Sequence, residues 1–373
     1  MGLLSRIDWL VVPIIILLMG ISLLVISSYS IQGDNTEAPF LTPLVKVQLQ
    51  WFAIGWSVYF LAAAFDYNKL REWTWAFYVL VLLLLIGLFF SDAVQRVHRW
   101  YKVPILNMSL QPSEYAKLSV VVALSWYMER HSGRSRSWST LLAAGLIVGI
   151  PFFLILKQPD LGTALVLYPV ALVMLYFGDA NPWVVRFMTA LSAIGLILVA
   201  SIFLGFVTPE QIKPYATKVL KEYQFDRLNP KTHQQQAAIT AIAVGGMTGT
   251  GWRKSTFTAG GWLPTPYTDS VFPAFGEEFG WLGILFLLTL FFILVYRCFQ
   301  VAIIAKDPFG RLLAAGITSY LAMHILINIG MMTGFLPITG VPLILVSYGG
   351  SSILSTMMAL GILQSIYARR FMF

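Results

Sequence analysis

The strongest constraint in this sequence is a recurring pattern of apolar runs, each about 17 to 25 residues long. A helix of this length crosses the hydrocarbon core of a bilayer and satisfies its own backbone hydrogen bonds, as lipid requires. The runs occupy residues 9–28, 47–65, 73–91, 112–129, 140–157, 161–178, 183–206, 271–297, 311–333 and 342–367. They predict an all-α, polytopic membrane protein with about ten transmembrane helices.

The composition excludes other classes of protein. The chain of 373 residues is 58% hydrophobic and 11% charged, whereas a soluble domain carries about 25% charged residues. A single cysteine, Cys298, excludes a disulfide framework and a cysteine-rich metal site. The net charge of +8 is attributed to loops that set membrane topology rather than to nucleic-acid binding.

Basic residues predict the orientation of the chain. Arg6 precedes the first apolar run, which places the N-terminus in the cytoplasm, and an even number of spans returns the C-terminus to the same side. Residues 1–373 then form one transmembrane domain, with a large extracytoplasmic loop at 207–270 between the seventh and eighth spans. The predicted cytoplasmic set is Arg6, Lys69, Arg71, Arg130, Arg134, Arg136, Arg186, Arg297, Lys306, Arg311, Arg369 and Arg370.

One short outer loop, 92–111, runs against this rule. It holds Arg96, His98, Arg99 and Lys102, although short outer loops are usually poor in Lys and Arg. Two interpretations remain open. The loop is a solvated surface, or its positive charge binds an anionic ligand such as a lipid phosphate.

Charged residues within the apolar spans are candidates for function because they are costly to insert. In QPSEYAK, 111–117, Glu114 and Lys117 lie three residues apart on one helix face. They form either a structural ion pair or the polar wall of a cavity. In KQPDLGT, 157–163, Asp160 either caps the next helix or faces a cavity where it binds a metal or a sugar hydroxyl.

The end of the long loop carries the third group of acidic residues. In LPTPYTDSVFPAFGEEFG, 263–280, Asp269 directly precedes an apolar run that contains Glu277 and Glu278. Asp269 alone fits a helix cap, but the neighbouring carboxylates favour a functional role. Upstream, the glycines of 245–252 lack the lysine of a P-loop, although they could still wrap a phosphate.

The last polar segment and the histidines are less specific. ITGVPLILVSYGGSS, 338–352, mixes Pro, Gly and small hydroxyl residues into a span, which indicates a broken helix or close helix packing. The four histidines show no ligand spacing. His98 lies near the basic outer loop, and the others are interpreted as loop or packing residues, namely His131, His233 and His324.

Across nearly its whole length the chain resembles the SEDS family, the shape, elongation, division and sporulation proteins. The RodA branch is closer than the division-specific FtsW branch. The matching pieces are RIDW at 6–9, RW at 99–100, QPSEYAK at 111–117, QPDLGTA at 158–164, the stretch from RLNP at 227–230 to GEEFG at 276–280, and GVPLILVSYGGSS at 340–352.

The resemblance implies a peptidoglycan glycosyltransferase in the bacterial inner membrane. Such an enzyme polymerises lipid II at the outer face for cell-wall elongation and cell shape, usually with a class B penicillin-binding transpeptidase as partner. The family's essential loop aspartate matches Asp269, the catalytic candidate. The residues implied to bind substrate are Arg99, Trp100, Glu114, Lys117, Asp160 and Ser347.

Two points stay open at this stage. A divalent cation, Mg²⁺ or Mn²⁺, could neutralise the leaving pyrophosphate, with Glu114, Asp160 and Asp269 as its conceivable ligands. The family's loop usually reads LPE-x-HTDFIF, so Thr265 and Tyr267 are departures, and the usual GTQ stretch is not evident.

The competing class is a flippase or another transporter of lipid-linked sugars. Polar groups inside a polytopic bundle also suit a transport path. A flippase needs access from both faces, whereas segments 111–117, 157–163 and 263–280 are all expected at the outer side. That placement favours an enzyme at the external face.

Overall fold

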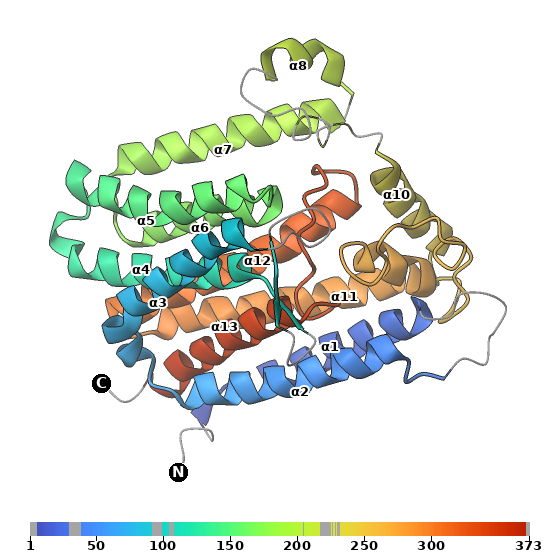
Figure 1. The fold of residues 1–373 in the computed structure, drawn as a ribbon, viewed down its shortest axis with the longest axis horizontal. Helices are drawn as coiled ribbons and strands as arrows, with labels where there is room; N and C mark the ends of the chain where they lie inside the picture. The colour runs from blue at the N-terminus through green and yellow to red at the C-terminus, as the bar shows by residue number, and fades with distance from the viewer. Residues whose placement is uncertain are drawn as a thin grey trace.

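The protein is a bundle of long helices that lie roughly side by side in a computed structural model (Figure 1). The structure describes residues 6–29, 39–91, 99–103, 108–203, 205–216, 225, 227, 229 and 232–370. Within these ranges the long helices are α1 Val11–Tyr29, α2 Pro43–Ala64, α3 Leu70–Gly87, α4 Pro112–Arg130, α5 Trp138–Lys157, α6 Leu161–Phe177, α7 Pro182–Phe203, α11 Val271–Ile304, α12 Pro308–Met332 and α13 Gly350–Ala368.

The connections add shorter elements. Helices α8 Pro209–Ala216 and α10 His233–Gly245 lie between α7 and α11 in the part of this connection that the structure describes. Between α3 and α4, strands β1 Tyr101–Val103 and β2 Met108–Leu110 pair antiparallel. Among the described residues, short 3₁₀ helices lie at η2 Tyr67–Lys69, η3 Leu88–Phe90 and η5 Ser132–Arg134.

The ten predicted spans each correspond to a long helix. Eight of these helices are long and apolar enough to cross a membrane, judged over the described ranges. The other two are α6, which has only 17 residues, and α4, which carries charged residues. These two helices pack in the bundle interior against α12, where short length and charge are tolerated because protein rather than lipid surrounds them.

The prediction of a span over 342–367 was wrong at its start. Residues 337–347 are not helical, and α13 begins only at Gly350. Within this stretch Val341 and residues 343–347 are buried. Non-helical backbone at this depth is possible because it is enclosed by protein, so the broken-helix interpretation is the correct one of the two considered.

The core of the bundle is formed by α12 and α13. Helix α13 packs along α2, and α12 packs against α4, α6 and α11. Small residues allow the close approach of α2 and α13. At Gly361, an added Cβ would lie 2.6 Å from the carbonyl oxygen of Tyr59, and at Gly55 it would lie 3.1 Å from Ile353.

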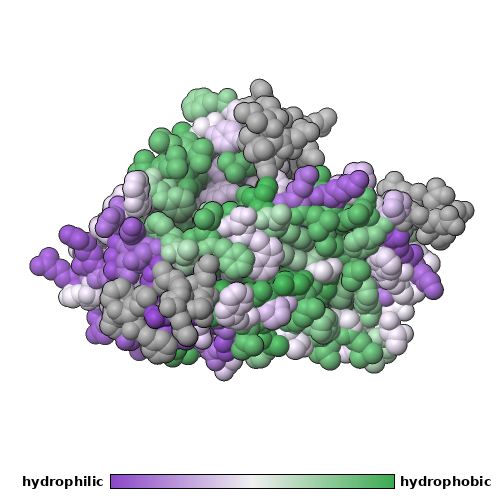
Figure 2. Space-filling model, turned by 90° about the horizontal axis from the view of Figure 1, so that it is seen from below, coloured by the Kyte–Doolittle hydropathy of each residue, from purple (hydrophilic) through white to green (hydrophobic). Residues whose placement is uncertain are grey.

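The two ends of the bundle differ in chemistry. Arg370 donates a hydrogen bond to the carbonyl oxygen of Arg6, so both described chain ends meet at one end. At this end Arg71 bridges Glu129 and Asp307, at 2.9 and 2.6 Å. A broad hydrophobic band separates this hydrophilic end from the other in the view of Figure 2, as expected for a protein surrounded by lipid.

Helix α11 contains a kink, and the 246–251 turn provides hydrogen-bond acceptors for the backbone amides that the kink leaves unpaired. Gly280 has φ +63°, which breaks the helical ladder. The freed amides of Trp281 and Leu282 donate to the carbonyl oxygens of Gly246 and Met247. Gly245 and Gly249 allow this turn to approach the backbone of α11 closely, because an added Cβ on either would lie 2.1 Å from an α11 carbonyl oxygen.

This packing generates a prediction about stability. A Cβ on Gly245 would lie 2.1 Å from the carbonyl oxygen of Gly276, so Gly245→Ala should destabilise the fold by about 1–3 kcal/mol through overpacking. Gly195→Ala is the matched control, because this glycine is also helical but has open space around it. Thermal unfolding in detergent should show a lower midpoint for G245A only. Equal midpoints would contradict the packing account.

Candidate functional site

The predicted polar segments converge at the bundle end opposite the chain termini. There the N-terminus of α4, the 158–160 junction before α6, the end of the long loop and the 339–349 segment meet. The expectation that segments 111–117, 157–163 and 263–280 share one side is therefore confirmed. Asp269 lies where the last two of these four segments touch.

Asp269 is positioned by hydrogen bonds to its backbone neighbours. The Asn328 side chain of α12 donates to the carbonyl oxygens of both Asp269, at 3.0 Å, and Val341, at 2.7 Å. Ser347 Oγ donates to the carbonyl oxygen of Thr268 at 2.6 Å and accepts from the amide of Leu343 at 2.8 Å. These bonds fix the loop and leave the Asp269 carboxylate free to point elsewhere.

Tyr267, one of the departures from the family pattern, also secures this loop. Its carbonyl oxygen accepts from the amide of Tyr348 at 2.8 Å. Its ring lies 4.8 Å from that of Tyr29 and 5.8 Å from that of Tyr348, measured between centroids. Thr265, the second departure, has φ +48°. Its carbonyl oxygen accepts hydrogen bonds from the amides of Thr268 and Ser270. Both replacements therefore take part in the turn that presents Asp269.

The surroundings of Asp269 raise the pKa of its carboxyl. Burial contributes most, because it penalises the charged form, and the negative charge of Asp160 adds to it. The positive charges of Arg99 and Arg227 act in the opposite direction. The side chain nevertheless keeps part of its surface accessible. The pKa of the Asp269 carboxyl therefore lies above the usual value for an aspartate. A carboxylate with a raised pKa is a stronger proton acceptor.

Asp160 caps α6 and also joins a polar network. Its Oδ1 accepts from the amide of Thr163 at 3.4 Å, as a capping carboxylate does. Its Oδ2 accepts from Gln111 Nε2 and Ser113 Oγ, both at 3.0 Å. The capping role is confirmed, and the second oxygen ties α6 to the start of α4.

Arg99 and Trp100 lie beside this junction, both half-buried. The Arg99 guanidinium donates to the carbonyl oxygen of Gln158 at 3.1 Å and to that of Pro159. Its charge therefore sits next to Asp160 and within electrostatic range of Asp269. The other members of the predicted anionic-ligand loop, Arg96, His98 and the side chain of Lys102, lie outside the described residues.

Glu114 and Lys117 form the ion pair that their spacing predicts. Lys117 Nζ lies 2.7 Å from Glu114 Oε1, and both side chains are buried. Nζ also lies 2.6 Å from His324 Nε2, and because an ammonium cannot accept, Nε2 must be the acceptor. The proton then resides on His324 Nδ1, which faces the carbonyl oxygen of Pro342 at 3.4 Å.

The conceivable metal ligands do not form a metal site. Across the described residues, no three His, Cys, Asp or Glu side chains are grouped so that they could hold an ion. Glu114 is engaged with Lys117 and Ser355, and Asp160 with Gln111 and Ser113. Glu114, Asp160 and Asp269 therefore do not fit a shared cation.

Glu277 and Glu278 point into the loop that precedes them. Glu277 accepts from the amides of Phe257 and Thr258 at 2.7 and 2.9 Å. Glu278 accepts from Ser28 Oγ and from the amide of Arg253. These carboxylates shape the 250–258 turn, so their closeness to Asp269 in sequence does not make them its partners.

Three residues of this network were missed by sequence analysis. His324 was interpreted as a loop or packing residue, Asn328 was not considered, and Gln111 was not singled out within the 111–117 segment. His324 and Asn328 lie four residues apart in the apolar span of α12. Lys117 was identified because polar groups are costly within a membrane span. The same signal could have identified His324 and Asn328.

The comparisons with known proteins agree with this geometry. The model of the cell cycle protein family that comprises FtsW, RodA and SpoVE matches residues 8–371. The chain belongs to this family, and it is a multi-pass membrane protein.

Several relatives are similar over most of their length. The peptidoglycan glycosyltransferase MrdB of Escherichia coli K12 is 31% identical, over 88% of this chain and 86% of its own. The stage V sporulation protein E of Bacillus subtilis is 32% identical, over 96% of each chain. Among solved structures, a chain described in a study of polymerisation and crosslinking by a peptidoglycan synthase complex is 26% identical. It aligns over 98% of both chains with a TM-score of 0.76. The RodA protein of Thermus thermophilus is 25% identical, with the same coverage and a TM-score of 0.69.

The buried pair makes a second prediction about stability. Lys117→Met should leave the Glu114 carboxylate buried without its cation and destabilise the protein by about 3–5 kcal/mol. The double variant E114Q/K117M should recover part of this loss, because it leaves no buried charge unpaired. Thermal unfolding of K117M, E114Q and the double variant E114Q/K117M tests this. If the two single-variant losses simply add, the side chains are not coupled.

Proposed function

We propose that this chain is a peptidoglycan glycosyltransferase that polymerises lipid II into glycan strands at the outer face of the bacterial cytoplasmic membrane. The observation that carries this proposal is Asp269, a partly exposed carboxylate on a loop that is hydrogen-bonded to Asn328 and Ser347, within electrostatic range of Arg99 and Arg227. The names of its relatives and the family model support the same class of activity.

The proposed reaction needs one proton acceptor. The 4-hydroxyl oxygen of the acceptor sugar attacks the anomeric carbon of the donor and forms the new glycosidic bond. The bond from that carbon to the undecaprenyl pyrophosphate oxygen breaks, and the pyrophosphate leaves with the electron pair. The hydroxyl proton passes to Asp269, which is a better base than an ordinary carboxylate because its pKa is raised.

The leaving pyrophosphate needs positive charge nearby. Arg99 and Arg227 supply it at the rim of the site, where both are half-buried. Lys117 is fully enclosed and engaged with Glu114 and His324. We therefore assign Lys117 and Glu114 to positioning α4 and, through His324, the segment that supports Asp269. The roles of Trp100 and Ser347 in substrate binding stay predictions. The Ser347 hydroxyl already donates to the carbonyl oxygen of Thr268.

The orientation and partner follow from the same proposal. With the termini in the cytoplasm, the Asp269 end faces outward, and loop 207–270 is extracytoplasmic. A class B penicillin-binding transpeptidase is the proposed partner, since the similar solved chain is described in a synthase complex that couples polymerisation to crosslinking. Elongation of the cell wall and cell shape are the proposed process.

The catalytic assignment predicts the effect of removing Asp269. Asp269→Ala should reduce glycan polymerisation by about 10²–10⁴-fold, the usual contribution of a general base. Purified lipid II would be incubated with wild type and variant, each with and without a co-purified class B partner. The glycan strands are then separated on a gel.

The control for this experiment is Thr240→Ala on α10, an exposed residue whose hydroxyl bonds only within its own helix, so this variant should stay folded and active. Unchanged thermal unfolding of D269A shows that its loss is chemical. Full polymerisation by D269A would overturn the assignment of the base. If the wild type makes no strands but moves lipid II across vesicles, the transporter alternative holds instead.

The charges around Asp269 predict opposite shifts in the pH profile. Arg227→Gln removes a charge that lowers the pKa of Asp269, so the acidic limb of polymerisation should move to higher pH. Asp160→Asn removes a charge that raises it, so the limb should move to lower pH, while Asn keeps the helix cap. Initial rates measured across pH test both. Shifts in the same direction would contradict the electrostatic account.

A further inference from the structure

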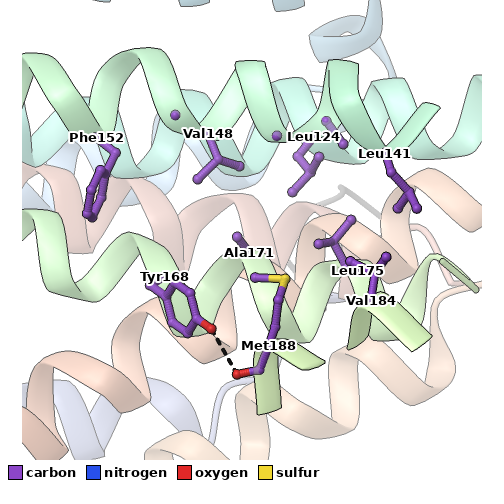
Figure 3. Close-up of a pocket in the computed structure, with 12 residues that line it drawn as sticks. Leu124, Leu141, Val148, Phe152, Tyr168, Ala171, Leu175, Val184 and Met188 are labelled. Atoms are coloured by element: carbon purple, nitrogen blue, oxygen red, sulfur yellow. Dashed lines mark hydrogen bonds between the residues drawn. The ribbon is translucent and has the colours of Figure 1, made fainter. Parts of the chain in front are cut away.

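Tyrosines in this bundle differ in whether the protein satisfies their hydroxyl groups. In the apolar cavity between α5, α6 and α7, the Tyr168 hydroxyl donates to the carbonyl oxygen of Met188 at 2.8 Å (Figure 3). Beside the proposed reaction site, Tyr29, Tyr267 and Tyr348 are half-buried. Within the described part of the chain, none of these three hydroxyls has a hydrogen-bond partner, and none is fully enclosed. Three phenol groups are therefore available to a ligand at this place.

The three rings form one cluster although they come from three segments. Tyr29 is the last residue of α1, Tyr267 belongs to the loop before α11, and Tyr348 lies just before α13. The Tyr267 ring contacts both of the others, at 4.8 and 5.8 Å between centroids. We call these three residues the tyrosine cluster. Its rings are held in place by one another, so a ligand that binds there meets a preformed aromatic surface.

The tyrosine cluster lies next to Asp269 along the contact between its loop and the 339–349 segment. These two stretches run past each other in opposite directions. At one end the Tyr348 amide donates to the carbonyl oxygen of Tyr267. At the other end Gly340 faces Asp269, because an added Cβ on Gly340 would lie 3.5 Å from Asp269 Oδ2. Two residues of extended chain span at most ~7 Å, a distance that one sugar ring with its hydroxyl groups bridges.

The two ends of the 339–349 segment carry different neighbours. At the first end the carbonyl oxygen of Thr339 accepts from Arg227 at 3.5 Å and lies against the start of α6, the side on which Arg99 is also bonded. At the second end the carbonyl oxygen of Ser347 accepts from Gln48 of α2 at 3.4 Å, and the tyrosine cluster follows. The arginines and the tyrosines therefore lie on opposite sides of Asp269.

The chemistry of a tyrosine suits one part of the proposed substrate. A tyrosine ring has an apolar face and a polar tip, and a pyranose ring has a face of C–H groups and a rim of hydroxyl groups. A sugar can thus stack on such a ring and bond to its hydroxyl at the same time. A pyrophosphate, in contrast, requires the positive charge of the arginine side. At position 267 the family usually has histidine, so this chain presents a larger apolar face there.

We infer that Tyr267, together with Tyr29 and Tyr348, binds the acceptor sugar. The sugar stacks its C–H face on the tyrosine cluster and presents its hydroxyl to Asp269 from the side opposite the arginines. Tyr267 is then a substrate-binding residue, not only a support of the loop. The identity of the sugar rests on the proposed function, whereas the existence of a sugar site at the tyrosine cluster can be tested without turnover.

The first test measures binding of a soluble probe to the full-length protein in nanodiscs. The probe is the disaccharide pentapeptide of lipid II without its lipid and pyrophosphate, so no reaction can occur. Saturation-transfer NMR then reports which probe protons contact the protein. We expect the strongest transfer to the C–H protons of the sugar that carries the attacking hydroxyl. Tyr267→Leu should weaken binding about fivefold to tenfold. Tyr267→Phe should fall between the two, because it keeps the ring and loses the hydroxyl.

The second test separates binding from chemistry. Initial polymerisation rates are measured against the concentration of lipid II. Y267L should raise KM by about the same factor and change kcat less than twofold, because Asp269 and the backbone hydrogen bonds of its loop remain. Tyr296→Leu is the matched control. It also removes a ring from an aromatic pair, with Phe292 on α11 away from the site, and should behave as the wild type does.

A variant outside the loop keeps the inference falsifiable. Tyr29→Leu changes α1 alone and should give the same loss of probe binding if Y267L unfolds. Unchanged probe binding in Y29L and in folded Y267L would overturn the inference. A lower kcat at constant KM and constant probe binding would show that the ring only supports the loop, and would also overturn it. If the wild type binds the probe through Tyr267 but makes no glycan strands, the sugar site stands and the proposed enzymatic function fails.

Discussion

Two non-helical segments satisfy each other's backbone at the outer end of this bundle, and the site depends on that interaction. Residues 263–270 and 339–349 would each leave polar groups unpaired if they faced lipid. Instead, the Tyr348 amide donates to Tyr267, and Ser347 donates to Thr268. Asn328 binds the carbonyl oxygens of both segments from α12. These bonds hold the loop that carries Asp269 against the 339–349 segment and against α12.

The buried charges extend the same support into the membrane region. Lys117 links α4 to α12 through His324, and His324 faces the carbonyl oxygen of Pro342. Glu114 is also bound by Ser355 of α13. One ion pair thus connects three helices to the segment that holds the Asp269 loop. A buried pair of this kind gives little stability by itself, but it penalises any arrangement that separates its members.

The positions of most membrane-spanning helices were predictable, because the length and apolarity of a single run of residues are enough to identify a span. The α4 ion pair and the Asp160 cap were also predictable, because their partners lie three residues away. The contacts of His324, Asn328 and Ser347 were not, because their partners lie far along the chain. The start of α13 was missed for a related reason. Residues 342–347 are apolar enough to be counted with the span that follows, and enclosure by other segments permits their non-helical backbone.

The kink of α11 has a mechanical consequence. Because the 246–251 turn is bonded to both sides of Gly280, at Glu278 and at Trp281, the turn and the first part of α11 form one stiff unit. Glu277 fastens the 257–258 backbone to the same unit. The outer surface of the turn is therefore built on the same unit that begins at Val271, two residues after Asp269.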